Sequence, residues 1–294
     1  MTTERDVARR LWMLAEPIHA VTYFSPEPLA ALRAAGFRGF WMGYFAGRAA
    51  PLGEVGAEIV HALFYNFTPE RVARALPDAW SHGSPDAALA ARLDGSVAAL
   101  RRCLDGQGGR ADLATIGRAA ELLSRVVSAQ PPEGRALFAA NRSLPEPVEP
   151  LARLWHAATL LREHRGDGHV AALVAAGIGG RESHVLHALG SGAPRDVYTV
   201  ARDFSDAEWA SCLESLRVKG LASADGLSEE GRRLKREVEA RTDDLASAGL
   251  SALAEDETDE LVALLWPIAR AVVAAGDIPV DSPMGLDLRT VAAG

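Results

Sequence analysis

The sequence of 294 residues predicts a mainly α-helical protein. Three observations support this fold class: apolar residues at helical spacing, capping residues followed by proline, and the absence of long alternating stretches that would form strands. The clearest helical stripe runs through Leu261, Leu264, Leu265, Ile268 and Val272. Helix starts with a hydroxyl residue before a proline stand at Ser25-Pro26, Thr68-Pro69 and Ser84-Pro85.

The helices are expected to form two related units, residues 1–148 and 149–294. The segment LAALRAAGFRG at 29–39 reappears 141 residues later as VAALVAAGIGG at 170–180. Five shorter matches follow the same order at similar offsets: Leu11-Trp12 with Leu154-Trp155, Ala50-Pro51 with Ala193-Pro194, Phe67-Thr68 with Phe204-Ser205, Ser84-Pro85 with Ser228-Glu229, and Val126-Val127 with Val272-Val273. This collinear order predicts a tandem duplication. The three prolines within 145–150 suit a linker between the copies.

The second unit contains the pattern of a winged helix. A helix over 205–219 is followed by a short ribbon within 221–227, turned by Asp225-Gly226, and by a long helix that begins after Ser228. The run LRVKGL at 216–221, followed by LSEEGRRL at 227–234, resembles the wing region of MarR-type regulators. The resemblance implies a fold and no ligand. Residues 72–100 would be a second, worn winged helix in the first unit.

Over the whole chain, three segments resemble a family of actinobacterial proteins of about this length that are labelled helix-turn-helix. These segments are EPIHAVTYF at 16–24, GFWMGYFAGRAAPLG at 39–53, and HRGDGHVAAL at 164–173. The resemblance implies the length and the fold, and it transfers no catalytic residues.

The charge of the chain disfavours nucleic acid and membrane surfaces as partners. There are 31 Lys and Arg against 39 Asp and Glu, a net charge of −8, and all of the excess negative charge lies in the second unit. No apolar run of membrane-spanning length occurs. The two cysteines, Cys103 and Cys212, lie far apart in no metal or redox spacing. We therefore expect a soluble, cytoplasmic protein.

The winged helix itself lacks the residues that read DNA. Its presumed reading helix opens with Asp206 and Glu208, and the wing at 223–226 has no basic residue. The basic groups within 232–236 alternate with glutamates, which is typical of a solvated helix face. DNA binding is therefore not the expected function.

Aromatic residues crowd into the first unit. Rings there either fill the core or line an apolar pocket, and Phe37, Phe40 and Phe64 are expected to fill the core. Arg48, one helical turn after Tyr44, would bind a carboxylate or enolate, or would pair with Glu54 or Glu58. The predicted substrate-binding residues of this unit are His19, Tyr23, Phe24, Trp41, Tyr44, Arg48 and Tyr65.

The second unit contributes histidines and carboxylates. Five of the eight histidines fall within 156–187, and Asp167 between two glycines is predicted to lie in a tight loop at a helix start. The predicted acid and base residues are Asp167, His169 and His164, with Glu182 and His187 as further binding residues. The alternative is that Asp167 is only a helix cap and that the histidines belong to the core or the surface.

No cofactor or metal is expected. His184 and His187 share a helix face, but a third ligand would have to come from elsewhere, and no HExxH motif occurs. The glycine-rich segments at 106–109 and 177–180 match no nucleotide-binding spacing.

Together these features predict a cleft between the two units, with the aromatic cluster as one wall and the histidine cluster as the other. The function expected is binding of an apolar or aromatic small molecule, by a metal-free acid/base enzyme or a binding protein of specialised metabolism. The alternative is a ligand-responsive winged-helix transcription regulator. Whether two copies pair as a homodimer is left open.

Overall fold

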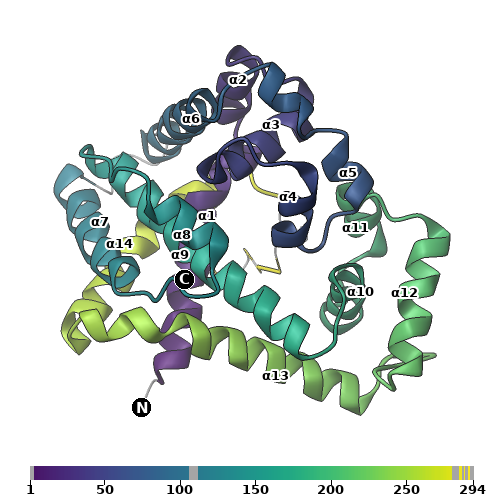
Figure 1. Ribbon diagram of the computed structural model, residues 1–294. Coiled ribbons are helices and arrows are strands. Elements are labelled where there is room, and N and C mark those ends of the chain that lie inside the picture. Colours follow the sequence, from purple (N-terminus) through teal and green to yellow (C-terminus); the bar gives the residue numbers. More distant parts are fainter. Residues whose placement is uncertain (1–2, 106–111, 280–284, 287, 289–290, 292–294) are drawn as a thin grey trace.

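The protein is mainly helical, as predicted. A computed structural model describes residues 3–105, 112–279, 285, 286, 288 and 291, and within them fourteen α-helices, three short 3-10 helices and one two-stranded ribbon. Figure 1 shows the helices grouped around α1 and α9, with α12 at the far edge of the molecule.

The first half of the chain contains eight of the α-helices. They are α1 (Glu4–Phe24), α2 (Pro26–Ala34), α3 (Gly39–Ala49), α4 (Ala57–Phe64), α5 (Pro69–Ala73), α6 (Pro85–Asp105), α7 (Leu113–Ser128) and α8 (Ala136–Arg142), with 3-10 helices η1 (Ala50–Leu52) and η2 (Asp78–Ser81). Thr68 and Ser84 accept backbone N–H groups at the starts of α5 and α6, as predicted. Ser25 makes no such bond and donates instead to Asp277 at 2.6 Å.

The second half begins with the longest helix. Its elements are α9 (Pro150–Ala175), α10 (Gly180–Ser191), α11 (Arg195–Arg202), α12 (Asp206–Val218), β1 (Ala222–Ser223), β2 (Gly226–Leu227), α13 (Glu229–Ala246), η3 (Ala248–Ala252) and α14 (Glu255–Ala274). The tight loop predicted around Asp167 is wrong, because Gly166, Asp167 and Gly168 lie within α9. Gly168 has a packing role instead: a Cβ there would lie 2.6 Å from a guanidinium nitrogen of Arg135, which donates to the His164 carbonyl.

Two helices form the centre of the fold. Residues 14–23 of α1 and 154–161 of α9 are buried without interruption, so both helices are covered on every side. They pack against each other, while α7 packs on α9 and α14 packs on α1. The Trp155 indole donates to Thr22 across this contact at 3.0 Å. The main hydrophobic cluster therefore draws on both halves, and the predicted boundary at 148/149 falls next to the start of α9, beside this shared core.

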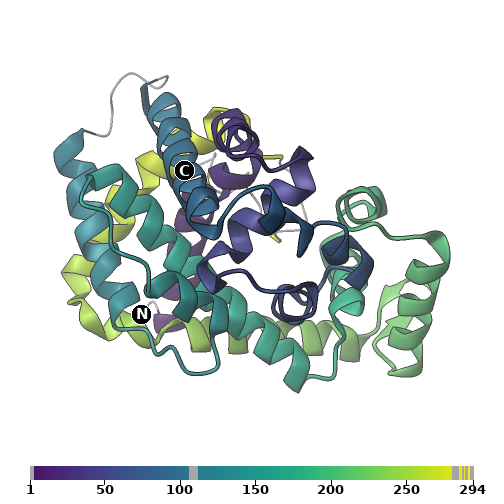
Figure 2. The ribbon, with the colours of Figure 1, turned by 45° about the horizontal axis from the view of Figure 1, so that its top comes forward.

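Each half adds a smaller cluster of its own. In the first half, apolar residues of α2 to α6, among them Leu32, Phe45 and Val60, pack together. In the second half, α10 to α13 and the ribbon enclose another set, which includes Val185, Tyr198 and Leu216. Figures 1 and 2 show α10, α11 and α12 extending to one side of the α1 and α9 pair.

The ribbon predicted within 221–227 is present. Ala222 pairs with Leu227, and Ser223 pairs with Gly226. It stands between α12 and α13, in the predicted order. The first half differs, because residues 72–100, all of which are described, form η2 and most of α6 and no strand. Pro77 has no N–H for a strand ladder, and Asp78 to Ser81 turn as a 3-10 helix. The worn winged helix expected there therefore lacks a wing.

The contact between α2 and α6 predicts that two helical glycines respond oppositely to substitution by alanine, as measured by the free energy of unfolding. A Cβ on Gly95 of α6 would lie 2.3 Å from the Pro28 Cα, whereas a Cβ on Gly117 of α7 would meet nothing within 4 Å. We expect Gly95→Ala to lower the free energy of unfolding by about 1–3 kcal/mol through overpacking. Gly117→Ala should raise it by about 0.5–1 kcal/mol through helix propensity. Urea denaturation measures both, and equal effects would contradict the packing described.

Candidate functional site

A cavity of about 480 Å³ lies between the two halves of the chain. Helices α1, α3 and α4 line it from the first half, and α9, α10, α11 and α13 line it from the second. A volume of this size is typical of small-molecule sites. The rings on its walls are Trp12, Tyr23, Phe24, Phe40, Trp41, Tyr44, Phe64, Tyr65 and Phe67. Of the rings expected to fill the core, Phe37 and Phe64 are buried, and Phe64 also reaches the cavity. The expectation is wrong for Phe40, which is 40% exposed and lines the cavity.

Nine of the twelve predicted site residues line this cavity. They are Tyr23, Phe24, Trp41, Tyr44, Arg48, Tyr65, Asp167, His169 and His187. The other three, His19, His164 and Glu182, do not. The structure thus places the aromatic residues of the first half opposite the histidine and carboxylate residues of the second. The chemical roles assigned to these residues remain predictions.

His164 and Glu182 have structural surroundings. His164 is fully buried, with its ring packed edge-on against Phe138 at 4.9 Å between centroids. Burial lowers the pKa of His164 to about 3, so the imidazole is a neutral core group. Glu182 accepts the Gly179 N–H at the start of α10 and binds Lys219 at 2.7 Å. Both were expected near the ligand, but each lies on a side of its helix that faces other protein groups.

His19 lies directly behind the cavity wall. Its Nε2 is 2.9 Å from the Tyr23 hydroxyl, and its Nδ1 is 2.9 Å from Thr159 Oγ1. Thr159 donates its own proton to the Trp155 carbonyl, so Thr159 Oγ1 must accept from His19 Nδ1–H. It follows that His19 Nε2 accepts from the Tyr23 hydroxyl. The oxygen of Tyr23 is therefore held in place by His19.

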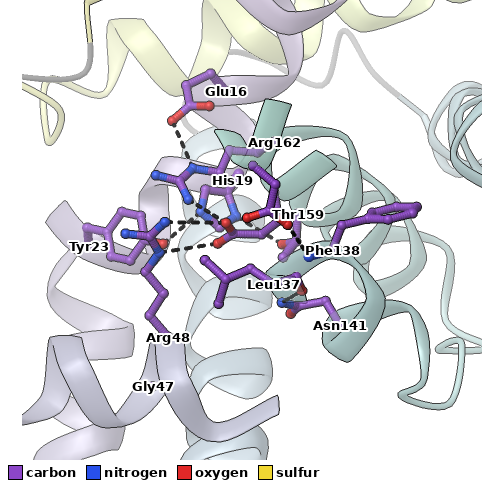
Figure 3. A network of polar contacts seen from close by, with 12 residues as sticks. Glu16, His19, Tyr23, Gly47, Arg48, Leu137, Phe138, Asn141, Thr159 and Arg162 are labelled. Carbon is purple, nitrogen blue, oxygen red and sulfur yellow. Dashed lines mark hydrogen bonds and ion pairs between the residues drawn. The ribbon is translucent and has the colours of Figure 1, made fainter. Parts of the chain in front are cut away.

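A buried ion network fixes the polar part of the wall (Figure 3). Arg48 Nε and one terminal nitrogen each lie 3.3 Å from a carboxylate oxygen of Glu163, and Arg162 lies 2.7 Å from the same carboxylate. Glu16 is 3.7 Å from Arg162. Burial by itself raises the pKa of Glu163, but Arg162 and Arg48 lower it well below its ordinary value.

This network corrects the expectation for Arg48. Its partner is Glu163 of the other half, 115 residues away, and not the nearby Glu54 or Glu58. Glu163, Arg162 and Glu16 are not among the site residues predicted from the sequence, although Glu163 belongs to the cluster of histidines and carboxylates in the second half. The sequence does contain a signal for these residues. Charged residues interrupt the apolar run of α9, and a helix that is buried on every side must place such residues against partners inside the protein.

Asp167 has a role different from the predicted cap on its own helix. Its Oδ2 accepts the backbone N–H of Phe138 at 3.0 Å, in the first turn of α8. It therefore caps a neighbouring helix, and it also lines the cavity. Burial raises the pKa of Asp167 to about 6. A carboxyl group in this state exchanges a proton near neutral pH, as acid/base chemistry requires.

His169 is held as a neutral base. Thr242 donates to the Val238 carbonyl at 2.7 Å, so its oxygen accepts from His169 Nδ1–H at 3.0 Å. The second ring nitrogen, Nε2, then carries a lone pair. Burial lowers the pKa of His169, which keeps the ring neutral at pH 7. His187, Lys235 and Glu239 line the same cavity.

The described residues contain no group of three or more His, Cys, Asp or Glu side chains arranged to bind a metal ion. Likewise, no described helix is both long enough and apolar enough to cross a membrane.

Comparison with known proteins identifies a family to which the chain is similar. A family model described as a helix-turn-helix family matches residues 8–279, which is nearly the whole chain. No curated protein and no solved structure matches the chain.

The environment of Asp167 predicts a pH dependence of stability. Its pKa is about 6 in the folded protein against 3.8 for the free side chain, so the folded state binds this proton more tightly. Stability from this group is complete below pH 3.8 and is lost as the pH rises through about 6. Asp167→Asn keeps an acceptor for Phe138 and cannot ionise.

We expect the free energy of unfolding of the parent, relative to Asp167→Asn, to fall by up to about 3 kcal/mol as the pH rises from about 4 to about 7. Urea denaturation of both proteins at each pH measures the difference. A difference that stays constant or grows with pH would contradict the burial of this carboxyl.

Proposed function

We propose that this chain, which belongs to the helix-turn-helix family, binds an apolar or aromatic small molecule in the cavity between its two halves. The observation that carries the proposal is the wall of rings opposite the fixed polar groups. Trp41, Tyr44 and Phe67 contact one another at 5.6–5.9 Å between centroids, which holds their faces and edges in set directions. Such a surface suits a flat, largely apolar compound.

A tandem duplication accounts for the position of the cavity, and we include it in the proposal. If α2 and α8 are set aside, the helices α1, α3, α4, α5, α6 and α7 of the first half pair in order with α9, α10, α11, α12, α13 and α14 of the second. The packing is reciprocal: α1 contacts α13 and α14, while α9 contacts α6 and α7. Two copies related in this way each supply one wall to the space between them.

The chemistry of the cavity supports a metal-free acid/base role. Asp167 has a pKa near 6, and His169 is a neutral base whose tautomer Thr242 fixes. Tyr23, fixed by His19, offers a hydroxyl oxygen to a bound molecule. These groups would serve a metal-free enzyme of specialised metabolism, or they would orient the same kind of compound in a binding protein. The description of the family as helix-turn-helix is compatible with an enzyme and with a binding protein.

The family description also favours a second candidate, a ligand-responsive regulator that uses the winged helix on DNA. The surface chemistry of α12 does not support it. The residues exposed along α12 include Asp206 and Glu214, and the exposed Arg217 lies 3.6 Å from Glu214. On α13, Arg233 pairs with Glu230 and Glu237, and Lys235 faces the cavity. Few basic groups therefore remain for phosphate contacts.

The first experiment uses the neutral fluorescent compound N-phenyl-1-naphthylamine as a probe of the cavity. We expect saturable binding with a Kd on the order of micromolar. Val170→Trp places a large side chain on the cavity wall and should weaken this binding at least about tenfold. The matched control is Val174→Trp on the same helix, whose parent side chain is 59% exposed and does not line the cavity.

Circular dichroism checks that both tryptophan variants remain folded. Binding that is absent from the parent, or that Val174→Trp reduces as much as Val170→Trp, would disprove a ligand site in this cavity.

The second experiment addresses DNA. Electrophoretic shift assays at moderate salt should show no tight, sequence-selective complex, because acidic side chains stand where α12 would need donors to base edges. A nanomolar complex with one DNA sequence, lost when Arg217→Ala is introduced, would establish the regulator instead.

A further inference from the structure

Arginines on the cavity wall are of two kinds. Arg48 and Arg162 share the carboxylate of Glu163, and Arg165 binds Asp243 at 2.9 Å. Arg202, the last residue of α11, has no carboxylate within ion-pair distance among the described residues. One terminal nitrogen donates to the neighbouring Ala201 carbonyl at 3.0 Å, and its Nε is buried without any described partner.

The charges around Arg202 do not compensate for it. The Arg202 guanidinium lies over the Phe67 ring at 4.5 Å, and the charged side chains that act on it most strongly are Arg48, Arg181 and Arg162. Burial lowers the pKa of Arg202 to about 10, so it still carries its proton at neutral pH. A half-buried cation without an ion-pair partner is costly, and an anion that enters the cavity would remove that cost.

Arg181, an arginine with a structural role in the same region, differs from Arg202 because it has a carboxylate partner. Arg181 also lies over a ring, Phe204, at 3.6 Å, but it forms a two-point ion pair with Glu208. Arg48 cannot replace Arg202 as an anion site, because its Nε and one terminal nitrogen already face Glu163. The contrast points to Arg202 as the arginine of this cavity that is left for a ligand. Lys235 of α13 is a second cation on the wall without an ion pair among the described residues.

We infer that the molecule bound in the cavity is an aromatic or apolar acid, and that Arg202 binds its carboxylate or equivalent oxyanion while its body packs on the rings around Tyr44 and Phe67. A guanidinium presents parallel N–H donors that match the two oxygens of such a group. This inference rests on the proposed function, and it adds the class of ligand.

Two probes of nearly the same shape test it. 1-Anilinonaphthalene-8-sulfonate has the skeleton of N-phenyl-1-naphthylamine plus one sulfonate. We measure the Kd of each by fluorescence, with Val170→Trp as the correction for binding outside the cavity. In the parent the anionic probe should bind more tightly than the neutral one.

Arg202→Met, which keeps an unbranched apolar stem and removes the charged guanidinium, should weaken the binding of the anionic probe roughly ten- to hundredfold and leave that of the neutral probe unchanged. Arg202→Lys should recover part of the anionic preference. The matched control is Arg195→Met, on the same helix but outside the cavity lining and paired with Asp206; it should leave both affinities unchanged. Thermal unfolding of the ligand-free proteins supplies a second readout, in which Arg202→Met should be at least as stable as the parent.

The outcomes separate the two proposals. One outcome is that the neutral probe binds and the sulfonate does not increase the affinity, or that Arg202→Met weakens the binding of both probes equally. In that case the ligand is not an acid, but the proposed ligand site remains supported. If neither probe binds the parent in a way that Val170→Trp reduces, both proposals fail.

Discussion

The ion pairs of the buried Glu163 carboxylate are the interaction on which the arrangement of the site depends. The carboxylate lies on the central helix α9, only 2% exposed, where an ionised group is tolerated only beside opposite charges. Arg162 supplies one cation from the same helix, and Arg48 supplies the other from α3. Because one partner comes from the other half of the chain, satisfying this carboxylate fixes α3 against α9. Arg48 lines the cavity and Glu163 adjoins it, so this ion pair links its two walls.

The same requirement for partners orders the rest of the wall. Thr159 and Thr242 each donate to a carbonyl one turn earlier in their own helix, which leaves each oxygen to accept from a histidine. His19 thereby orients Tyr23, and His169 keeps a free nitrogen. Polar groups that have all their partners inside the protein do not reorganise when a molecule enters, which is the condition for specific binding in an apolar cavity. Arg202 has no ion-pair partner among the described residues, which is why we infer that it binds the anionic group of a ligand.

Membership of a helix-turn-helix family describes how helices are connected and leaves the function to surface and cavity chemistry. In this chain α12 exposes carboxylates at the place where a DNA-reading helix exposes donors, and Lys235 of α13 faces the cavity. The helices of the second half thus serve as a wall of the cavity, in a scaffold that the two halves build together.

Local signals in the sequence determined the helices and many of the cavity residues. Capping hydroxyls at Thr68 and Ser84 begin helices, and Asp225-Gly226 turns the ribbon, because these effects act within a few residues of the chain. The concentration of aromatic residues in one half and of histidines in the other identified nine of the side chains that meet in the cavity, because both kinds of residue are concentrated in short segments of the sequence.

Only the tertiary structure decided which partner each polar group has. Asp167 and its two glycines suggested a loop, yet they lie within α9, where Arg135 packs against Gly168. His164 turned to the core, and Arg48 found its carboxylate 115 residues away. A residue's burial and its nearest opposite charge depend on contacts between distant segments, and these same two quantities set its pKa and its availability to a ligand.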